Sequence, residues 1–153
     1  MKTLKRFIGI ALLAVAPLFA GTSTASAAER VITTSQLPAK AQTTLSNHFS
    51  NEKITRVFKD VNSRGVAEYE VDFTAGRDIE FDSTGNWTSI DCKGTAVPDA
   101  LVPQAIRNYV ARNVKSGRII SIDKERKGYN VKLTNGYDYH FDVNGKFRFA
   151  EPD

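Results

Sequence analysis

The sequence contains two copies of one pattern, and this repeat limits the possible folds more than any other feature. Residues 81–87 (Phe-Asp-Ser-Thr-Gly-Asn-Trp) match residues 141–147 (Phe-Asp-Val-Asn-Gly-Lys-Phe) at an offset of 60. Nearer the N-terminus the offset becomes 65, because residues 37–49 match residues 102–114. The five-residue difference falls near Asn62-Ser-Arg-Gly65, which is typical of a longer loop. The chain therefore consists of two similar structural units.

Each unit begins with an amphipathic helix. In the first unit, apolar residues recur every four positions over residues 37–49, which predicts a helix with Thr34 or Ser35 as its N-cap. In the second unit, Asp99 is the expected N-cap of a helix with an apolar stripe over residues 102–114. The simplest interpretation of both stripes is that they pack on a sheet.

Short segments of alternating apolar and polar residues follow each helix, and this pattern predicts antiparallel strands with one buried face. The segments are residues 69–73, 79–81, 129–133, 137–141 and 147–149. Three-residue loops that end in glycine connect them, at Gly76, Gly85, Gly136 and Gly145. We therefore predict an α+β fold. Two tandem α-β-β-β-β repeats would form one continuous antiparallel sheet, with both helices on one face.

The N-terminus is typical of a secretory signal peptide. Basic residues precede an apolar run from Phe7 to Ala20, and Ala25-Ser-Ala27 fits the small-residue rule for cleavage. We predict a signal peptide over residues 1–27, then a first repeat at 28–95 and a second at 96–153 within one domain. The alternative, a membrane anchor, would need a longer apolar run. The expected location is periplasmic or secreted, with no membrane span in the mature chain.

Charge does not indicate a nucleic-acid partner. The whole chain has 21 Lys and Arg against 17 Asp and Glu, a formal charge of +4. The predicted signal peptide contains three of these bases, so the mature chain carries about +1. Cys92 is the single cysteine, which excludes an internal disulfide framework. It is either a small buried apolar residue or a thiol that pairs with another chain.

The combination of a signal peptide, two helix-plus-meander units and the Phe-Asp-x-x-Gly-x-aromatic hairpin resembles the PepSY-like, or β-lactamase-inhibitor-like, family. The resemblance covers roughly residues 34–149. It implies an exported protein whose curved sheet binds another protein, in the manner of an inhibitor or a sensor. It supplies no catalytic residues.

The glycine-ended loop at Thr74-Ala-Gly76 fixes a register that places acids opposite acids on the face away from the core. The predicted pairs are Asp72 with Asp78, Glu70 with Glu80, and Glu68 with Asp82. Like charges at such positions destabilise a hairpin by up to about 1 kcal/mol per pair. The same register in the second unit gives the balanced pairs Lys132–Asp138 and Asn130–His140.

Two functional hypotheses and a simpler interpretation follow from this acidic patch. The first is a surface for an unidentified envelope protein, with the candidate contacts Arg56, Phe58, Glu68, Glu70, Asp72, Asp78, Glu80 and Asp82. The second is a calcium site with the ligands Glu70, Asp72, Asp78 and Glu80. The simpler interpretation is that these acids are solvated and partly balanced by neighbouring bases. The strand that carries Arg56 has two alternative orientations, because Thr55 and Val57 compete for the core.

No pattern indicates an enzyme. His48 and His140 are isolated, and the sequence has no Gly-x-Ser-x-Gly, phosphate-binding glycine loop or His-Glu-x-x-His motif. The Asp-x-x-Gly loops lack the spacing of a calcium-binding loop and are typical of tight turns. We predict a non-catalytic protein without a cofactor, apart from calcium under the second hypothesis.

Overall fold

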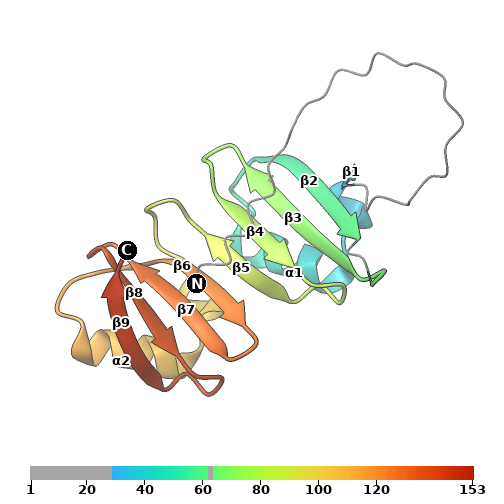
Figure 1. The fold of residues 1–153 in the computed structure, drawn as a ribbon. Coiled ribbons are helices and arrows are strands. Elements are labelled where there is room, and N and C mark those ends of the chain that lie inside the picture. Colours follow the sequence, from blue (N-terminus) through green and yellow to red (C-terminus); the bar gives the residue numbers. More distant parts are fainter. Residues whose placement is uncertain (1–28, 62–63) are drawn as a thin grey trace, which may run out of the picture.

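The computed structural model describes residues 29–61 and 64–153, in which the chain forms one nine-stranded antiparallel sheet and two α-helices (Figure 1). The strands follow one another across the sheet in chain order, from β1 to β9. The α+β class and the single antiparallel sheet predicted from the sequence are confirmed. The predicted signal peptide and the first half of the predicted loop at residues 62–65 lie outside the described residues.

The elements alternate as the repeat predicts. The first part contains β1 (Arg30–Val31), a short 3-10 helix (Thr34–Gln36), α1 (Ala39–His48), β2 (Ile54–Val61), β3 (Ala67–Phe73), β4 (Asp78–Phe81) and β5 (Trp87–Asp91). The second contains a 3-10 helix (Asp99–Leu101), α2 (Gln104–Asn113), β6 (Ile119–Glu125), β7 (Gly128–Leu133), β8 (Tyr137–Phe141) and β9 (Phe147–Pro152). This order is compatible with two copies of one unit.

Irregularities in the strand pairing also recur at the repeat offsets. The register shifts between Ile54 and Arg56 on β2, and at the equivalent place on β6, between residues 119 and 121. It shifts again after Glu80 on β4 and after His140 on β8. The first shift decides which residue of β2 enters the core: Val57 is buried, and Thr55 is exposed.

The predicted N-caps of the two α-helices are wrong. Thr34 and Asp99 each begin a 3-10 helix, whereas α1 starts after Pro38 and α2 starts after Pro103. Proline pushes the residue before it out of the helical region, so neither α-helix can extend back to the expected cap. The fixed φ of proline suits the beginning of the helix that follows it.

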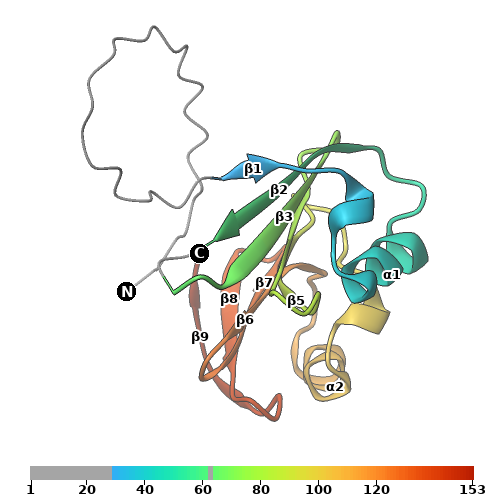
Figure 2. The same cartoon turned by 90° about the vertical axis from the view of Figure 1, so that its right-hand side faces the viewer.

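One row of apolar side chains crosses the sheet and forms the centre of the core. Each residue of the row pairs with the next one on the neighbouring strand, from β2 to β7. The row consists of Val57, Val71, Ile79, Ile90, Ile122 and Val131. All six are at most 3% exposed and belong to the same cluster as Ala41 and Leu45 of α1 and Ile106 of α2. Burying a side chain of this size contributes roughly 1.5–3 kcal/mol. Figure 2 shows both helices to the right of the strands.

Candidate functional site

The sheet residues that alternate with this core row form an outer face, and cross-strand pairing arranges them in two rows. One row contains Phe58, Glu70, Glu80, Ser89, Asp123, Asn130, His140 and Phe149. The other contains Arg56, Asp72, Asp78, Asp91, Ser121, Lys132, Asp138 and Glu151. Most residues predicted from the register as partner contacts or cation ligands therefore lie on one surface.

The predicted acid–acid register is confirmed for two of its three pairs. Glu70 lies opposite Glu80, and Asp72 lies opposite Asp78. The third expected pair is not part of the ladder, because β4 ends at Phe81 and Asp82 belongs to the following turn. The carboxylate of Asp82 accepts hydrogen bonds from Thr84 and Asn86, and these bonds lower the pKa of Asp82 although its partial burial acts in the opposite direction. Glu68 pairs instead with Asp60 on β2. In the second repeat, the pairs Lys132–Asp138 and Asn130–His140 are confirmed.

Acidic residues are concentrated on the outer face. It carries eleven of the 17 in the chain, namely Asp60, Glu68, Glu70, Asp72, Asp78, Glu80, Asp91, Asp123, Glu125, Asp138 and Glu151. The segments that form the two helices contrast with it, because residues 30–51 and 100–122 contain no Asp or Glu. The small net charge of the mature chain therefore conceals a strong separation of charge between surfaces.

Several bases partly neutralise the acids. Arg56 Nη2 lies 3.3 Å from Asp72 Oδ2, as the simpler interpretation of the patch expects. Lys93 Nζ lies 3.1 Å from Asp78 Oδ1 and 2.5 Å from Asp91 Oδ2. No sequence pattern predicts the Lys93 contacts, because this residue follows β5 in a loop and has a φ of 45°.

Glu70 lies close to several other acidic residues of the outer face. Partial burial, together with the nearby charges of Asp72, Glu80 and Asp78, raises the pKa of Glu70 to about 7. Burial likewise raises the pKa of Asp123, while a hydrogen bond of 2.6 Å from Ser89 Oγ to its Oδ1 opposes the shift. A group that titrates near neutral pH is sensitive to any cation that approaches it.

Aromatic side chains flank the acidic centre on both sides. The guanidinium of Arg56 lies 5.1 Å from the ring centroid of Phe58, which is half-buried. On β9, Phe149 is 49% exposed and stacks on His140 with the ring centroids 4.3 Å apart. His140 Nε2 also lies 3.3 Å from Glu151 Oε1. Phe149 was not among the predicted contacts, because its pairing with His140 depends on the register shift between His140 and Phe141.

Within residues 29–61 and 64–153, no group of three or more His, Cys, Asp or Glu side chains is arranged to hold a metal ion. The acids predicted as calcium ligands share a surface without forming such a cage. Cys92 is 1% exposed, and burial raises the pKa of its thiol to about 11. This burial agrees with the interpretation of Cys92 as a small apolar core residue.

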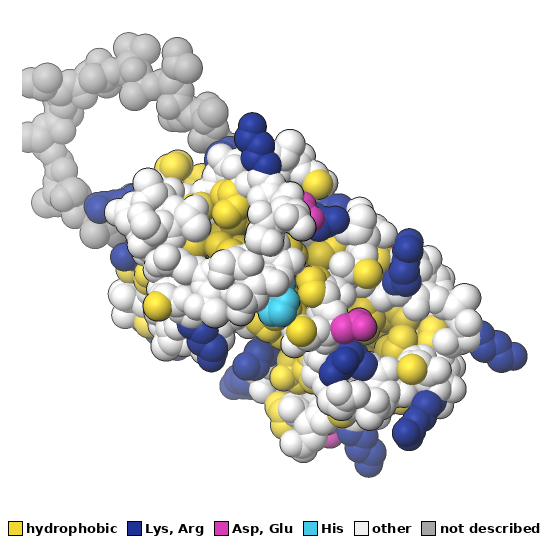
Figure 3. Space-filling view, turned by 180° about the vertical axis from the view of Figure 1, so that it is seen from behind, with side chains coloured by type: hydrophobic (Ala, Val, Ile, Leu, Met, Phe, Trp, Pro, Cys, Tyr) yellow, Lys and Arg dark blue, Asp and Glu magenta, His cyan; other side chains and the backbone are white. Residues whose placement is uncertain are grey.

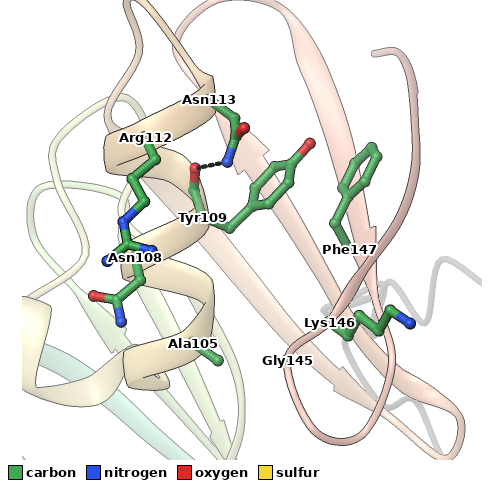
Figure 4. A pocket seen from close by; sticks show the side chains of 8 residues that line it. All are labelled: Ala105, Asn108, Tyr109, Arg112, Asn113, Gly145, Lys146 and Phe147. Carbon is green, nitrogen blue, oxygen red and sulfur yellow. Dashed lines mark hydrogen bonds between the residues drawn. The ribbon is translucent and has the colours of Figure 1, made fainter.

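A groove lies on the helix side of the sheet, between α2 and the β8–β9 hairpin (Figure 4). Its volume is about 480 Å³, and its lining includes Asn108, Tyr109, Arg112, Gly145, Lys146 and Phe147. The rings of Tyr109 and Phe147 stack with centroids 4.5 Å apart and planes within 10°. Sequence reasoning assigned Tyr109 to the core stripe and missed this groove. The available signal was the repeat itself, which places Thr44 where the second unit has Tyr109.

Comparisons with known proteins place this chain in a family. The family model described as "Putative beta-lactamase-inhibitor-like, PepSY-like" matches residues 24–65 and 67–148. That description names an inhibitor-like module and not a known enzyme family. None of the curated proteins matches the chain.

Three solved structures share the fold. A "putative periplasmic protein from DUF2874 family" of Bacteroides vulgatus is 36% identical, with a TM-score of 0.77 over 80% of this chain and 96% of that one. A "putative calcium-regulated periplasmic protein" of Bacteroides thetaiotaomicron is 35% identical, with a TM-score of 0.76 over 80% of this chain and 96% of that one. A further "putative periplasmic protein of unknown function" of B. vulgatus is 32% identical, with a TM-score of 0.75 over 81% of this chain and 99% of that one.

All three neighbours are described as periplasmic, in agreement with the location that the sequence predicts. In the part of the chain that the structure describes, neither helix has the length and apolar character needed to cross a membrane. The family match spans most of the chain, and the predicted resemblance is confirmed. The chain belongs to the PepSY-like, β-lactamase-inhibitor-like family.

Proposed function

We propose that this protein is an exported binding module that acts in the periplasm and contacts a protein partner through the outer face of its sheet, without catalysis. The signal-peptide pattern and the periplasmic neighbours support the location. The family description supports an inhibitor-like role.

The observation that carries this proposal is the composition of the outer face. Eleven acids gather there, with Phe58 toward one side of the sheet and Phe149 toward the other. In Figure 2 both described helices lie on the other side of the strands, so neither of them covers this face. Acidic side chains steer and orient a basic partner, and aromatic anchors supply apolar contact area. The partner surface that fits this face is basic, with apolar positions at its margins.

The proposal is tested by chemical cross-linking in periplasmic extract, followed by affinity measurement with any partner identified. The test variant combines Glu70→Gln with Phe58→Ala, because these residues are paired across β2 and β3. The matched control combines Asp99→Asn with Val143→Ala, which removes one exposed acid and one exposed apolar side chain elsewhere. We expect the test variant to bind the partner with at least about tenfold lower affinity, which corresponds to a loss of about 1.4 kcal/mol of binding free energy. The control should bind with normal affinity.

If both variants lose affinity for the partner, the partner does not bind specifically through the outer face and the proposal is wrong. If both variants bind normally and the test variant is only more stable, the outer face is a solvated structural surface and the proposal is wrong.

Calcium binding is the second candidate, because a relative with 35% identity is described as calcium-regulated. Under this proposal, Glu70, Asp72, Asp78 and Glu80 supply the carboxylate oxygens that Ca²⁺ prefers. Side-chain rotation would have to bring these oxygens closer together than they lie in the structure, in which they form no metal-holding group.

A thermal melt with and without millimolar Ca²⁺ separates the two candidates, because a ligand that binds only the folded state raises the melting temperature. Calcium binding predicts a rise for the natural protein and none for Glu70→Gln/Glu80→Gln. An unchanged melting temperature in both proteins would exclude the calcium candidate and leave the protein-binding proposal intact.

A further inference from the structure

The groove beside α2 lies on the opposite side of the molecule from the acidic outer face, and its charge has the opposite sign. Arg112 stands on the helix bank and Lys146 on the hairpin bank (Figure 4). Neither forms an ion pair with any residue that the structure describes. No acid lines the groove, and the surrounding segment 100–122 contains four bases and no acids. Figure 3 shows this helix side, where Lys and Arg side chains are widespread and acidic ones are few.

The floor of the groove is apolar. Tyr109 and Phe147 stack on one another. Tyr109 also packs edge-on against Phe141, with the ring centroids 5.4 Å apart. The hairpin approaches the helix closely at Gly145, where an added Cβ would come within 2.9 Å of Ala105 Cβ. Because aromatic packing and this contact fix both banks, the groove is formed before any ligand binds.

We propose that this groove binds an acidic, extended segment of a protein partner. Carboxylates along the segment would pair with Arg112 and Lys146, and an apolar side chain between them would rest on the stacked rings. Charge complementarity selects an anionic partner, and the aromatic floor selects one that also carries apolar groups. This site is separate from the outer face and does not depend on the function proposed for it.

The geometry favours a peptide over other anions. In Figure 4 the two cationic side chains point in different directions from the two banks, so they suit separate carboxylates better than a single small ion. A bilayer surface is flat and would not reach the rings in a concave groove. An extended chain presents successive side chains at spaced positions and can enter the groove.

The first repeat provides a comparison within the same molecule. At the positions that correspond to Arg112 and Lys146 it has the neutral residues Asn47 and Asn86. Its hairpin is tied to α1 by a hydrogen bond from Lys40 Nζ to Asn86 Oδ1. The cationic, aromatic groove is therefore a property of the second repeat and not of the repeated fold.

The test uses the purified protein and a fluorescein-labelled peptide of alternating glutamate and serine with one central phenylalanine, at low ionic strength. The double variant Arg112→Asn/Lys146→Asn introduces the residues of the first repeat. The charge-matched control is Arg126→Asn/Lys127→Asn, in the exposed β6–β7 turn. We expect the groove variant to bind the peptide about tenfold more weakly, the control to change affinity less than twofold, and both to melt at the native temperature.

Backbone amide NMR locates the peptide independently. Shifts concentrated in α2 and residues 145–147 would support the proposal. The proposal is overturned if the peptide does not bind, if both variants lose affinity equally, or if the shifts lie elsewhere. It is also overturned if phosphatidylglycerol vesicles bind through Arg112 and Lys146 while the peptide does not, because the groove would then be part of a lipid-binding surface.

Discussion

Glu70 and Glu80 lie directly opposite one another on β3 and β4, and on the reverse face their neighbours Val71 and Ile79 form the centre of the core. Two carboxylates are thus held together by the same hairpin register that buries two apolar side chains. The pairing cannot shift by one residue without turning either Val71 or Ile79 toward solvent. Core packing therefore maintains an arrangement that electrostatics alone would oppose.

This relationship predicts a pH-dependent stability. The pKa of Glu70 is raised from 4.5 to about 7 in the folded state, so between these values the folded protein binds more protons than the unfolded chain. The stabilisation from protonated Glu70 is complete below about pH 4.5 and is lost as the pH rises to about 7. After a discount for solvent screening it is on the order of 1–2 kcal/mol.

Urea unfolding at pH 5 and pH 8 checks this expectation. The natural protein should lose more stability between the two pH values than Glu70→Gln, which should be the more stable of the two at pH 8. Asp99→Asn, at an exposed site off the sheet, is the control and should follow the natural protein. An unaltered pH dependence in Glu70→Gln would show that Glu70 does not titrate in this range.

Gly128 is expected to be irreplaceable. Its φ is +146°, and an added Cβ would lie 1.9 Å from the carbonyl oxygen of Phe141, so the backbones of β7 and β8 would have to separate. Gly128→Ala should cost about 3 kcal/mol or more, because it combines backbone strain with a steric clash. Gly136 has a φ of +81° but nothing within 4 Å of an added Cβ, so Gly136→Ala should cost only about 1–2 kcal/mol. Equal losses in denaturant unfolding would contradict this interpretation.

The central core row predicts that the two repeats unfold together. Ile90 on β5 pairs with Ile122 on β6, and this pair joins the two units through the middle of the sheet. Ile79→Ala in the first repeat should cost roughly 2–5 kcal/mol. It should also lower hydrogen-exchange protection in β7 of the second repeat. Val143→Ala, at a site that is 61% exposed, should change stability by less than about 0.5 kcal/mol. Exchange that increases only in the first repeat would show that the units unfold separately.

Cys92 should not react with thiol reagents while the protein is folded. It is 1% exposed, and its pKa of about 11 leaves little thiolate at pH 8. Ellman's reagent should therefore modify it at the rate of unfolding, and rapidly in urea. Immediate reaction of the native protein, or a disulfide-linked dimer on a non-reducing gel, would contradict this expectation.

The sequence by itself determined the features that depend on nearby residues. Alternation with a period of two and three-residue loops ending in Gly76 and Gly136 were enough to place Glu70 opposite Glu80 and Lys132 opposite Asp138. A hairpin is local, so its loop length fixes its register. The repeat offset also predicted the order of the elements, and the hairpin motif predicted the family.

Tertiary structure decided the features that join distant segments. It brought Lys93 between Asp78 and Asp91, and it formed the Ser89–Asp123 hydrogen bond where β5 meets β6 across 34 residues of sequence. It also created the groove between α2 and the β8–β9 hairpin. Contacts of this kind depend on how a twisted sheet and its helices pack, and no local pattern specifies that packing. The sequence could therefore predict an acidic surface, but only the folded chain shows that a basic groove lies on the opposite side.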